Sequence, residues 1–336
     1  MTFALAQWED ITVGTLTNMP DRTLTKPVPV ILDTDIGTDI DDTWALAHLL
    51  RCPELDLKLV LTASGDMPFR ARITAKFLEV AGRADIPVGL GFPGETPEQD
   101  RNQGPWIKGY ELTQYPGEIV EDGIGRMIRL IMESPEPVTV IGIAPSFNLA
   151  EALRREPAIA GRCRLVGMFG SFNLGYNGEP KPCAETNVRV SQASARVALA
   201  APWLDVLITP LDTCGTTVLE GALYHKIWSA TDDPVLRAVI ENYCLFAPRV
   251  SWMHCPYFAL RSTVLFDCVA VYLAYSEDLV ETETVRYRIN DEGMTIADPA
   301  GDCVARVALR WKDEPAFLAH LTDRLLGLAV GAVTSK

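Results

Sequence analysis

Short apolar runs alternate with segments of helical periodicity along most of the chain, and this alternation limits the fold more than any other feature. The run PVPVIL (27–32) has the Val/Ile content of a strand buried on both faces, and DTWALAHLLRC (42–52) follows at helical spacing. This pairing returns about every 25–30 residues, which is typical of βαβ units and a parallel sheet. Further strand-like runs lie at 55–64, 86–91, 138–144, 164–170 and 204–211, and further helical patterns at 69–83 and 123–134.

After about residue 215 the pattern becomes mostly helical. The exception is TVRYRINDEGMTIA (284–297), which alternates around the turn signal NDEG and predicts a hairpin. We therefore predict an α/β fold: an open, mostly parallel Rossmann-like sheet flanked by helices, with a helical C-terminal portion and a late β-hairpin. In this interpretation residues 1–26 form an N-terminal arm and residues 27–336 a single domain.

Composition excludes several classes of partner. The 336 residues carry a net charge of −14, whereas nucleic-acid binders are more often basic. No apolar stretch approaches the ~18 residues that a membrane span needs, and the N-terminus lacks a basic signal-peptide region. Eight cysteines occur without CxxC spacing, so we expect reduced thiols and a cytoplasmic protein.

The segment DTDIGTDIDD (33–42), called the aspartate turn below, gathers five aspartates between a predicted strand and a predicted helix. Ligands of open parallel sheets bind at such strand ends, and Asp33 and Asp35, two residues apart, leave a strand on the same face. Two unit charges about 4 Å apart repel by roughly 1 kcal/mol in water and about 4 kcal/mol at an effective dielectric of 20. The turn therefore predicts a bound cation, and a set of oxygen ligands without His or Cys suits Ca²⁺ or Mg²⁺.

Two other interpretations of the aspartate turn are weaker. Asp41 and Asp42 could be helix caps and Asp39 a solvated loop acid, but this leaves Asp33 and Asp35 unexplained. The haloacid-dehalogenase-like phosphatases begin with a strand that ends in DxDx[TV]. Here DTDIG places a glycine where that Thr or Val belongs, and that motif has no use for a second aspartate pair.

A closer resemblance is to the inosine–uridine-type nucleoside hydrolases, whose opening signature is an apolar strand followed by DxDxGxDDAxA. DTDIGTDIDDTWALA resembles a longer variant of this signature with two residues inserted. Four later blocks resemble the family in the same order: TASGDMPFRARITAKFLEVAGRADIPVGLG, VIGIAPSFNLAEAL, AETNVRVSQASARVAL and STVLFDCVAVYLA. Together they cover residues 28 to about 280.

The resemblance implies a calcium site and a sugar site. The implied Ca²⁺ ligands are Asp35, Asp42, the backbone carbonyl of Phe147 and Asp267. The implied substrate-binding residues are Asp41, Asp66, Met168, Glu179, Glu185 and Asn187. Asp267 has independent support, because an unpaired carboxylate would be costly in the apolar helix VLFDCVAVYLA. Asp66 stands where many members carry Asn, and it adds a negative charge.

The implied reaction is hydrolysis of the N-glycosidic bond of a ribonucleoside to ribose and free base, as in purine or pyrimidine salvage. A calcium-bound water would attack the sugar, and Asp35 would be the general base. Some members place a His before the late Asp to assist the leaving base; here this residue is Phe266. The resemblance also implies a homodimer or homotetramer acting on a small-molecule nucleoside.

Other residues are candidates to contact the leaving base. Trp252, His254 and Tyr257 lie just upstream of Phe266, with core or lid packing as the alternative. We interpret His48 and His320, in helical runs, as structural, and PLDTCG (210–215) as a turn and helix entry despite its cysteine. Two alternatives keep the same fold: a non-catalytic nucleoside or sugar sensor, and a hydrolase of another riboside such as a nicotinamide or modified nucleoside.

Overall fold

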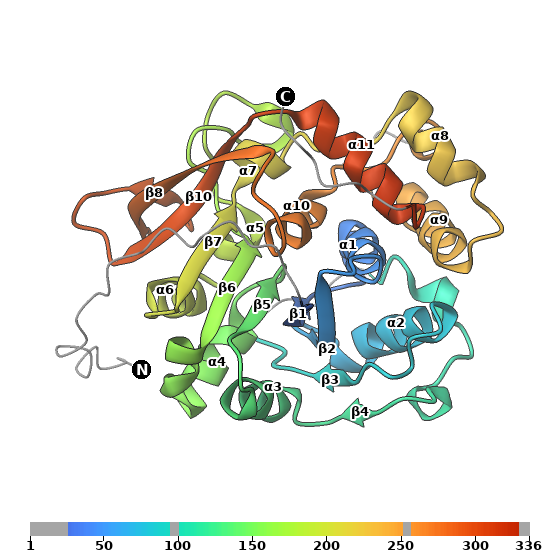
Figure 1. The fold of residues 1–336 in the computed structure, drawn as a ribbon, viewed down its shortest axis with the longest axis horizontal. Helices are drawn as coiled ribbons and strands as arrows, with labels where there is room; N and C mark the ends of the chain where they lie inside the picture. The colour runs from blue at the N-terminus through green and yellow to red at the C-terminus, as the bar shows by residue number, and fades with distance from the viewer. Residues whose placement is uncertain (1–25, 95–100, 251–256, 329–336) are drawn as a thin grey trace.

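The computed structural model describes residues 26–94, 101–250 and 257–328, and its strands form a ten-stranded sheet (Figure 1). The strand order across the sheet is β4-β3-β2-β1-β5-β6-β7-β10-β8-β9. The strands are β1 (Val28–Thr34), β2 (Leu55–Thr62), β3 (Val88–Leu90), β4 (Ile119–Val120), β5 (Val138–Gly142), β6 (Cys163–Met168), β7 (Asp205–Thr209), β8 (Val280–Ile289), β9 (Thr295–Ala297) and β10 (Cys303–Trp311). Strands β1 to β7 and β10 pair in parallel, whereas β8 pairs antiparallel with β10 and with β9.

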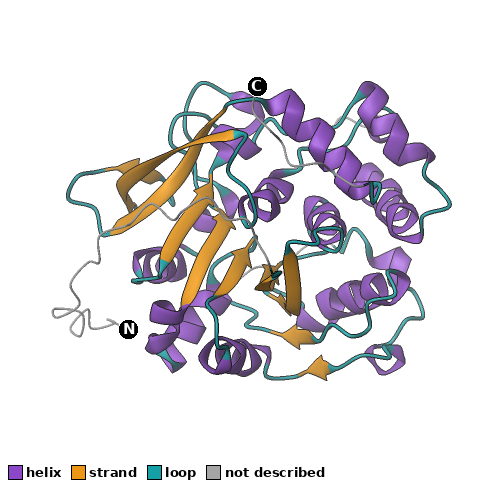
Figure 2. Cartoon of the chain, in the orientation of Figure 1, coloured by secondary structure: helices purple, strands orange, loops and turns teal. Residues whose placement is uncertain are grey.

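Helices connect and cover these strands (Figure 2). The α-helices are α1 (Asp41–Leu49), α2 (Met67–Val80), α3 (Gly123–Glu133), α4 (Phe147–Arg155), α5 (Thr186–Arg189), α6 (Gln192–Ala200), α7 (Leu211–Cys214), α8 (Gly221–Ser229), α9 (Pro234–Phe246), α10 (Phe266–Leu273) and α11 (Glu314–Leu325). Short 3-10 turns are η1 (Gly104–Ile107), η2 (Leu112–Gln114), η3 (Pro157–Arg162), η4 (Tyr176–Gly178), η5 (Ala247–Arg249) and η6 (Tyr257–Ala259). Among the described helices, none is long and apolar enough to cross a membrane.

Helix starts follow ordinary capping chemistry. Asp66, Asp233 and Asp313 each accept a backbone N–H from the first turn of α2, α9 and α11, and each of these helices has a proline in its first two positions.

The sheet separates two hydrophobic layers. Successive residues of β1 alternate between them, since Val30 and Leu32 belong to one cluster and Ile31 to the other. The first layer contains α1, α2 and α8 to α11, and the second contains α3, α4 and α6, on opposite sides of the sheet in Figure 1. Strand β1 lies between β2 and β5 and is buried on both faces, which explains its continuous apolar run.

The predicted fold class is confirmed, including the parallel sheet and the late hairpin, in which β8 and β9 pair antiparallel. The prediction omitted one strand, because the C-terminal part also contains β10, which joins β7 to β8 in the sheet. Its sequence CVARVALRW is rich in Ala, Leu and Arg, which favour helices, but pairing with two neighbours makes it a strand. The proposed domain limits stay a prediction, and residues 1–25 of the predicted arm lie outside the described residues.

Candidate active site

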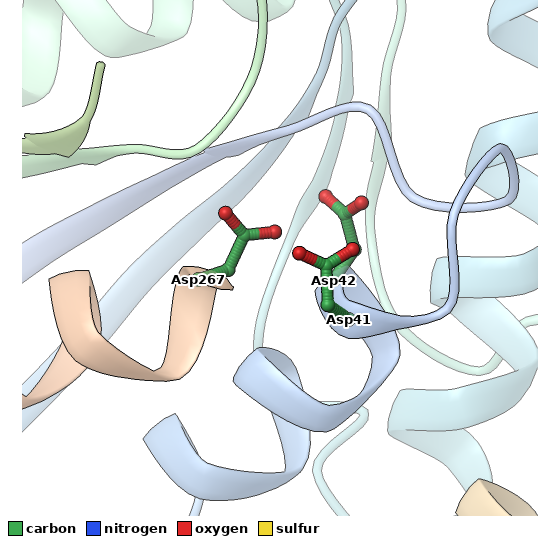
Figure 3. Close-up of side chains that lie close together, drawn as sticks. All are labelled: Asp41, Asp42 and Asp267. Atoms are coloured by element: carbon green, nitrogen blue, oxygen red, sulfur yellow. The ribbon is translucent and has the colours of Figure 1, made fainter. Parts of the chain in front are cut away.

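Three carboxylates meet at the carboxyl edge of the parallel strands. Asp41 and Asp42 begin α1, and Asp267 is the second residue of α10 (Figure 3). One oxygen from each of the three side chains lies within 4.8 Å of the others, and all three residues are buried. Helices α1 and α10 pack directly on each other, so residues more than 200 positions apart share one site.

The aspartates of α1 are placed by the fold and do not cap the helix. The N-cap of α1 is Ile40, with no side-chain cap bond, so the capping interpretation of Asp41 and Asp42 is wrong. Thr34, at the end of β1, donates its hydroxyl to Asp42. Asp39 is half-buried and accepts the Ile40 N–H at 2.6 Å. The positive end of the α1 macrodipole favours the charges of Asp41 and Asp42 at these first positions.

Burial and mutual repulsion raise the pKa of every carboxyl in this group. Burial is the main cause for Asp41, Asp42 and Asp267, whose pKa values lie well above the ordinary range, and neighbouring aspartates raise them further. The pKa of Asp33 rises to about 7, chiefly through burial, and one of its oxygens has no hydrogen-bond partner while the other accepts the Asn148 amide at 2.7 Å. Desolvated carboxylates that repel one another are stable as anions only beside a cation.

The donor set fits a hard divalent cation such as Ca²⁺ or Mg²⁺. Carboxylate oxygens supply all three ligands of the compact group, and within the described part of the chain no His or Cys joins it. Hard oxygen ligands of this kind suit Ca²⁺ or Mg²⁺ better than zinc. Buried anions with raised pKa values are the electrostatic pattern expected of a site that holds such an ion.

Two other predicted metal ligands lie on neighbouring loops. Asp35 follows β1; burial raises its pKa, the Arg70 guanidinium lowers it, and its charge in turn raises the pKa values of Asp42 and Asp267. Phe147 is the first residue of α4, after β5. Asp35 lies outside the compact group of three, whereas Asp41, predicted as a sugar contact, lies within it. Metal ligation by Asp35 and by the Phe147 carbonyl stays a prediction.

The predicted sugar residues Glu185, Asn187 and Met168 lie together. Glu185 caps α5 by accepting the N–H groups of Asn187 and Val188, and it also accepts the Gly170 N–H after β6. The Asn187 amide donates to the Met168 carbonyl at 3.2 Å and to the Ile143 carbonyl at 3.4 Å. These bonds fix the α5 start against the ends of β5 and β6, with the Asn187 Oδ1 atom left to accept from a ligand.

Two further predicted sugar contacts lie nearer the surface. Asp66 caps α2, accepting the Phe69 N–H at 3.0 Å, and forms an ion pair with Arg101. The negative charge that Asp66 adds where many family members carry Asn is thus partly neutralised by Arg101. Glu179 is exposed, and its backbone carbonyl closes a loop by accepting the N–H groups of Gly175 and Lys181. The sugar-binding roles of Asp66 and Glu179 stay predictions.

An aromatic pair borders the carboxylates. Phe266, half-buried beside Asp267, meets the ring of Tyr176 edge-on, with ring centroids 5.8 Å apart. The Tyr176 hydroxyl accepts the Thr186 N–H at 3.0 Å, next to Glu185. Sequence reasoning missed Tyr176, since it lies in the divergent loop before the AETN block. The other candidates for contact with the base are Trp252 and His254, which lie outside the described residues, and Tyr257, which begins η6.

The remaining predicted assignments concern histidines and a cysteine. His48 and His320 both hydrogen-bond the Tyr275 hydroxyl, at 3.1 and 2.8 Å, inside the helical layer, as expected for structural residues. Burial lowers their pKa values to about 3 and about 4. PLDTCG (210–215) follows β7 and forms the short helix α7 with its two caps, as predicted, and Cys214 is buried.

Arg70 was also missed. Arginine is usually exposed, but the Arg70 side chain is 2% exposed and reaches the aspartate turn. The signal was present in the spacing, because Arg70 is in phase with Ile73 and Phe77 on the core face of α2.

A protein-family model and relatives of known function match this chain. The family model described as inosine-uridine preferring nucleoside hydrolase matches residues 30–319. The non-specific ribonucleoside hydrolase RihC of Klebsiella pneumoniae is 27% identical over 252 residues, which are 68% of this chain and 80% of that protein. RihC of Salmonella paratyphi B is 30% identical over 213 residues, which are 61% of this chain and 67% of that protein.

Solved structures resemble the fold. A plant nucleoside hydrolase superposes with a TM-score of 0.76 at 23% identity, covering 89% of this chain and 99% of that one. A purine-preferring ribonucleoside hydrolase from Gardnerella vaginalis gives a TM-score of 0.70 at 21% identity, covering 89% and 98% of the two chains. At these identities the likeness concerns the fold.

Proposed function

We propose that this chain, which belongs to the inosine-uridine preferring nucleoside hydrolase family, hydrolyses the N-glycosidic bond of ribonucleosides to ribose and free base with the help of calcium. The observation that carries the proposal is the buried group of Asp41, Asp42 and Asp267 at the carboxyl edge of the sheet. A group this acidic and this buried is costly for the fold, and a bound cation that also acts on the substrate accounts for it.

Asp35, Asp42, Asp267 and the Phe147 carbonyl would hold the ion, as the family resemblance implies. A calcium ion supplies Lewis-acid chemistry when bound, since it polarises oxygen ligands and lowers the pKa of water. Asp41 lies in the compact group with Asp42 and Asp267, so its carboxylate is near the proposed ion. A ribose whose hydroxyls bind that ion would place them next to Asp41. This position suits a residue that accepts a hydrogen bond from a ribose hydroxyl.

The chain's own groups divide the work around the sugar. Asp35 is the proposed general base, and its half-buried side chain is more accessible than those of the buried group of three aspartates. Asn187, with its amide N–H groups already bound to backbone carbonyls, offers Oδ1 to a hydroxyl. The surrounding carboxylates stabilise positive charge that develops on the sugar as the C1′–N bond breaks. Phe266 and Tyr176 would form an apolar wall beside the departing base.

A panel of ribosides tests the proposal. Purified protein, stripped with EDTA and reloaded with calcium, is incubated with purine, pyrimidine and nicotinamide ribosides, and free base and reducing sugar are measured separately. We expect equal amounts of both products, loss of activity in EDTA and recovery with calcium. Full activity without metal would refute the calcium role. Tight nucleoside binding without any cleavage would instead support a sensor.

Cellular context and assembly are also proposals. The seven cysteines that the structure describes are all unpaired, which supports a reducing compartment such as the cytoplasm. We propose a homodimer or homotetramer from the family resemblance. Light scattering after size-exclusion chromatography gives the mass directly, and a value near 36.9 kDa would refute it.

A further inference from the structure

A buried arginine lies directly beneath the aspartate turn. Arg70, in the first turns of α2, is 2% exposed. Its guanidinium donates to the carbonyls of Asp35 and Ile36, the latter at 2.9 Å, and to the Thr38 hydroxyl at 2.8 Å. The remaining nitrogen, Nε, donates to the Ser64 carbonyl in the next strand-to-helix loop.

These contacts join two loops whose backbones are held in unusual conformations. Ser64 has a φ of 67°, which is uncommon for a residue with a side chain, and its carbonyl is the one that Arg70 Nε engages. Gly37 has a φ of 109°, and a Cβ there would lie 2.8 Å from Ile73 and 2.9 Å from Phe69. The turn therefore packs closely on α2, and Arg70 bonds to it on both sides of the glycine.

A neutral side chain holds the other end of the turn. Gln103, fully buried, donates to the Asp39 carbonyl at 3.1 Å and accepts the Thr43 hydroxyl at 3.0 Å. Gln103 thus connects the later part of the aspartate turn to α1. Arg70 and Gln103 together donate to the backbone carbonyls of Asp35, Ile36 and Asp39.

We propose that Arg70 is a positioning residue, which holds the aspartate turn against the loop at Ser64 and so sets the place of Asp35 relative to Asp42 and Asp267. The proposal rests on the proposed function, since that function gives these carboxylates their task. Arg70 acts through hydrogen bonds to backbone and hydroxyl oxygens more than through its charge, because its nearest contact with the Asp35 carboxylate is 3.9 Å. Its planar fork fits this set of acceptors, which an ammonium group cannot reproduce.

The geometric and the purely electrostatic roles predict opposite effects on metal affinity. If Arg70 were only a positive charge near the site, its removal would strengthen calcium binding. If Arg70 holds the turn, its removal displaces Asp35 and weakens binding. Loss of residues that orient metal ligands typically weakens metal affinity about 10–100-fold.

The test compares Arg70→Met and Arg70→Lys with Arg72→Met as the matched control. Arg72 lies on the same helix, has 28% of its side chain exposed and contacts Glu111 at 3.8 Å. Calcium affinity is measured by isothermal titration calorimetry on EDTA-stripped protein. Hydrogen exchange is followed in a peptide covering the aspartate turn, in the metal-free state, and kcat and KM are measured with a nitrophenyl riboside.

For Arg70→Met we expect calcium affinity about 10–100-fold weaker, kcat reduced with little change in KM, and exchange in the turn at least about tenfold faster. Arg70→Lys should recover only part of each loss, and Arg72→Met should match the wild type. Tighter calcium binding in Arg70→Met, or unchanged exchange in the turn, would overturn the proposal. If Arg70→Met does not fold, Arg70→Lys decides: wild-type values in all three measurements overturn it.

Failure of the proposed function has a different signature. A wild type that neither binds calcium nor cleaves ribosides refutes that function. In that case hydrogen exchange in the metal-free turn still decides the role of Arg70, with faster exchange only in the Arg70 variants supporting it.

Discussion

Replacing Asp267 by Asn should stabilise the metal-free protein while it abolishes calcium binding. The side chain is buried, its pKa lies well above the ordinary value of 3.8 because of burial and of Asp41 and Asp42, and one of its oxygens lies within 4.8 Å of theirs. Two unit charges at this separation repel by about 3.5 kcal/mol at an effective dielectric of 20.

Protonation limits this penalty. Keeping a carboxyl with an ordinary pKa of 3.8 protonated at pH 7 costs at most about 4 kcal/mol, at 1.36 kcal/mol for each pH unit. The amide of Asn removes the charge without the proton, so we expect a gain of about 2–4 kcal/mol in the free energy of unfolding in EDTA at pH 7.

The pH dependence gives a second check with a definite sign. A carboxyl whose pKa is raised by folding binds a proton more tightly in the folded state, so the contribution of Asp267 to the stability of the metal-free wild type rises as the pH falls from 7 towards its ordinary pKa of 3.8. The Asn variant lacks this contribution from residue 267. The difference between the two proteins should therefore shrink on acidification.

Urea unfolding followed by circular dichroism measures these free energies, with Asp302→Asn as the control because Asp302 is exposed. Saturating calcium at about 100 times its dissociation constant should add about 2.7 kcal/mol to the wild type and much less to Asp267→Asn. An Asn variant that is less stable than the wild type in EDTA, or that binds calcium equally well, would refute the reasoning.

Three further outcomes are expected. Asp41→Ala and Asn187→Ala should retain the fold but lose about 1.5–3 kcal/mol of transition-state stabilisation each, measured as kcat/KM; equal cleavage of ribosides and 2′-deoxyribosides would contradict their hydroxyl-binding role. With Phe266 in the position of an acid, nitrophenyl ribosides, whose leaving group needs no proton, should react much faster than natural nucleosides, and comparable rates would show that another acid acts. His48 has its pKa lowered to about 3 by burial, so its own contribution to the free energy of unfolding should fall by about 2 kcal/mol between pH 7 and 5, as the unfolded imidazole protonates. The difference in stability between the wild type and His48→Gln should change by this amount over that range, and identical pH slopes would contradict it.

The aspartate turn was predictable because its signals are local. An apolar run, five acidic residues and a helical pattern follow one another within 26 residues, from 27 to 52. Asp267 was also accessible to sequence reasoning, as the charged residue of an otherwise apolar helix. That Asp267 lies beside the aspartates of α1 was harder to predict, because this depends on the packing of α1 against α10, which no local pattern specifies.

Residues whose role depends on distant partners were missed. Arginine is usually found at the surface, and the burial of Arg70 is tolerable because carbonyl and hydroxyl oxygens of two loops accept its N–H groups. Tyr176 lies in a loop without periodicity, and it packs against Phe266, which comes 90 residues later in the sequence. In β10, every second residue from Cys303 to Val307 is buried, as in a strand. The segment was not predicted as a strand because its residues have a weak strand propensity.

The ends of the ten-stranded sheet bear on how copies of this chain could assemble. Its two outer strands, β4 and β9, contain only two and three residues, whereas central strands such as β2 contain eight. β9 pairs only with residues 287–289 of β8, and the rest of that strand carries exposed charged side chains such as Glu281 and Glu283. Short outer strands and charged edge residues both make a poor template for another strand, and natural proteins use them to prevent chains from adding edge to edge. A homo-oligomer built by extending the sheet is therefore disfavoured. For the same reason, the short outer strands β4 and β9 should protect this large sheet from fibrous aggregation.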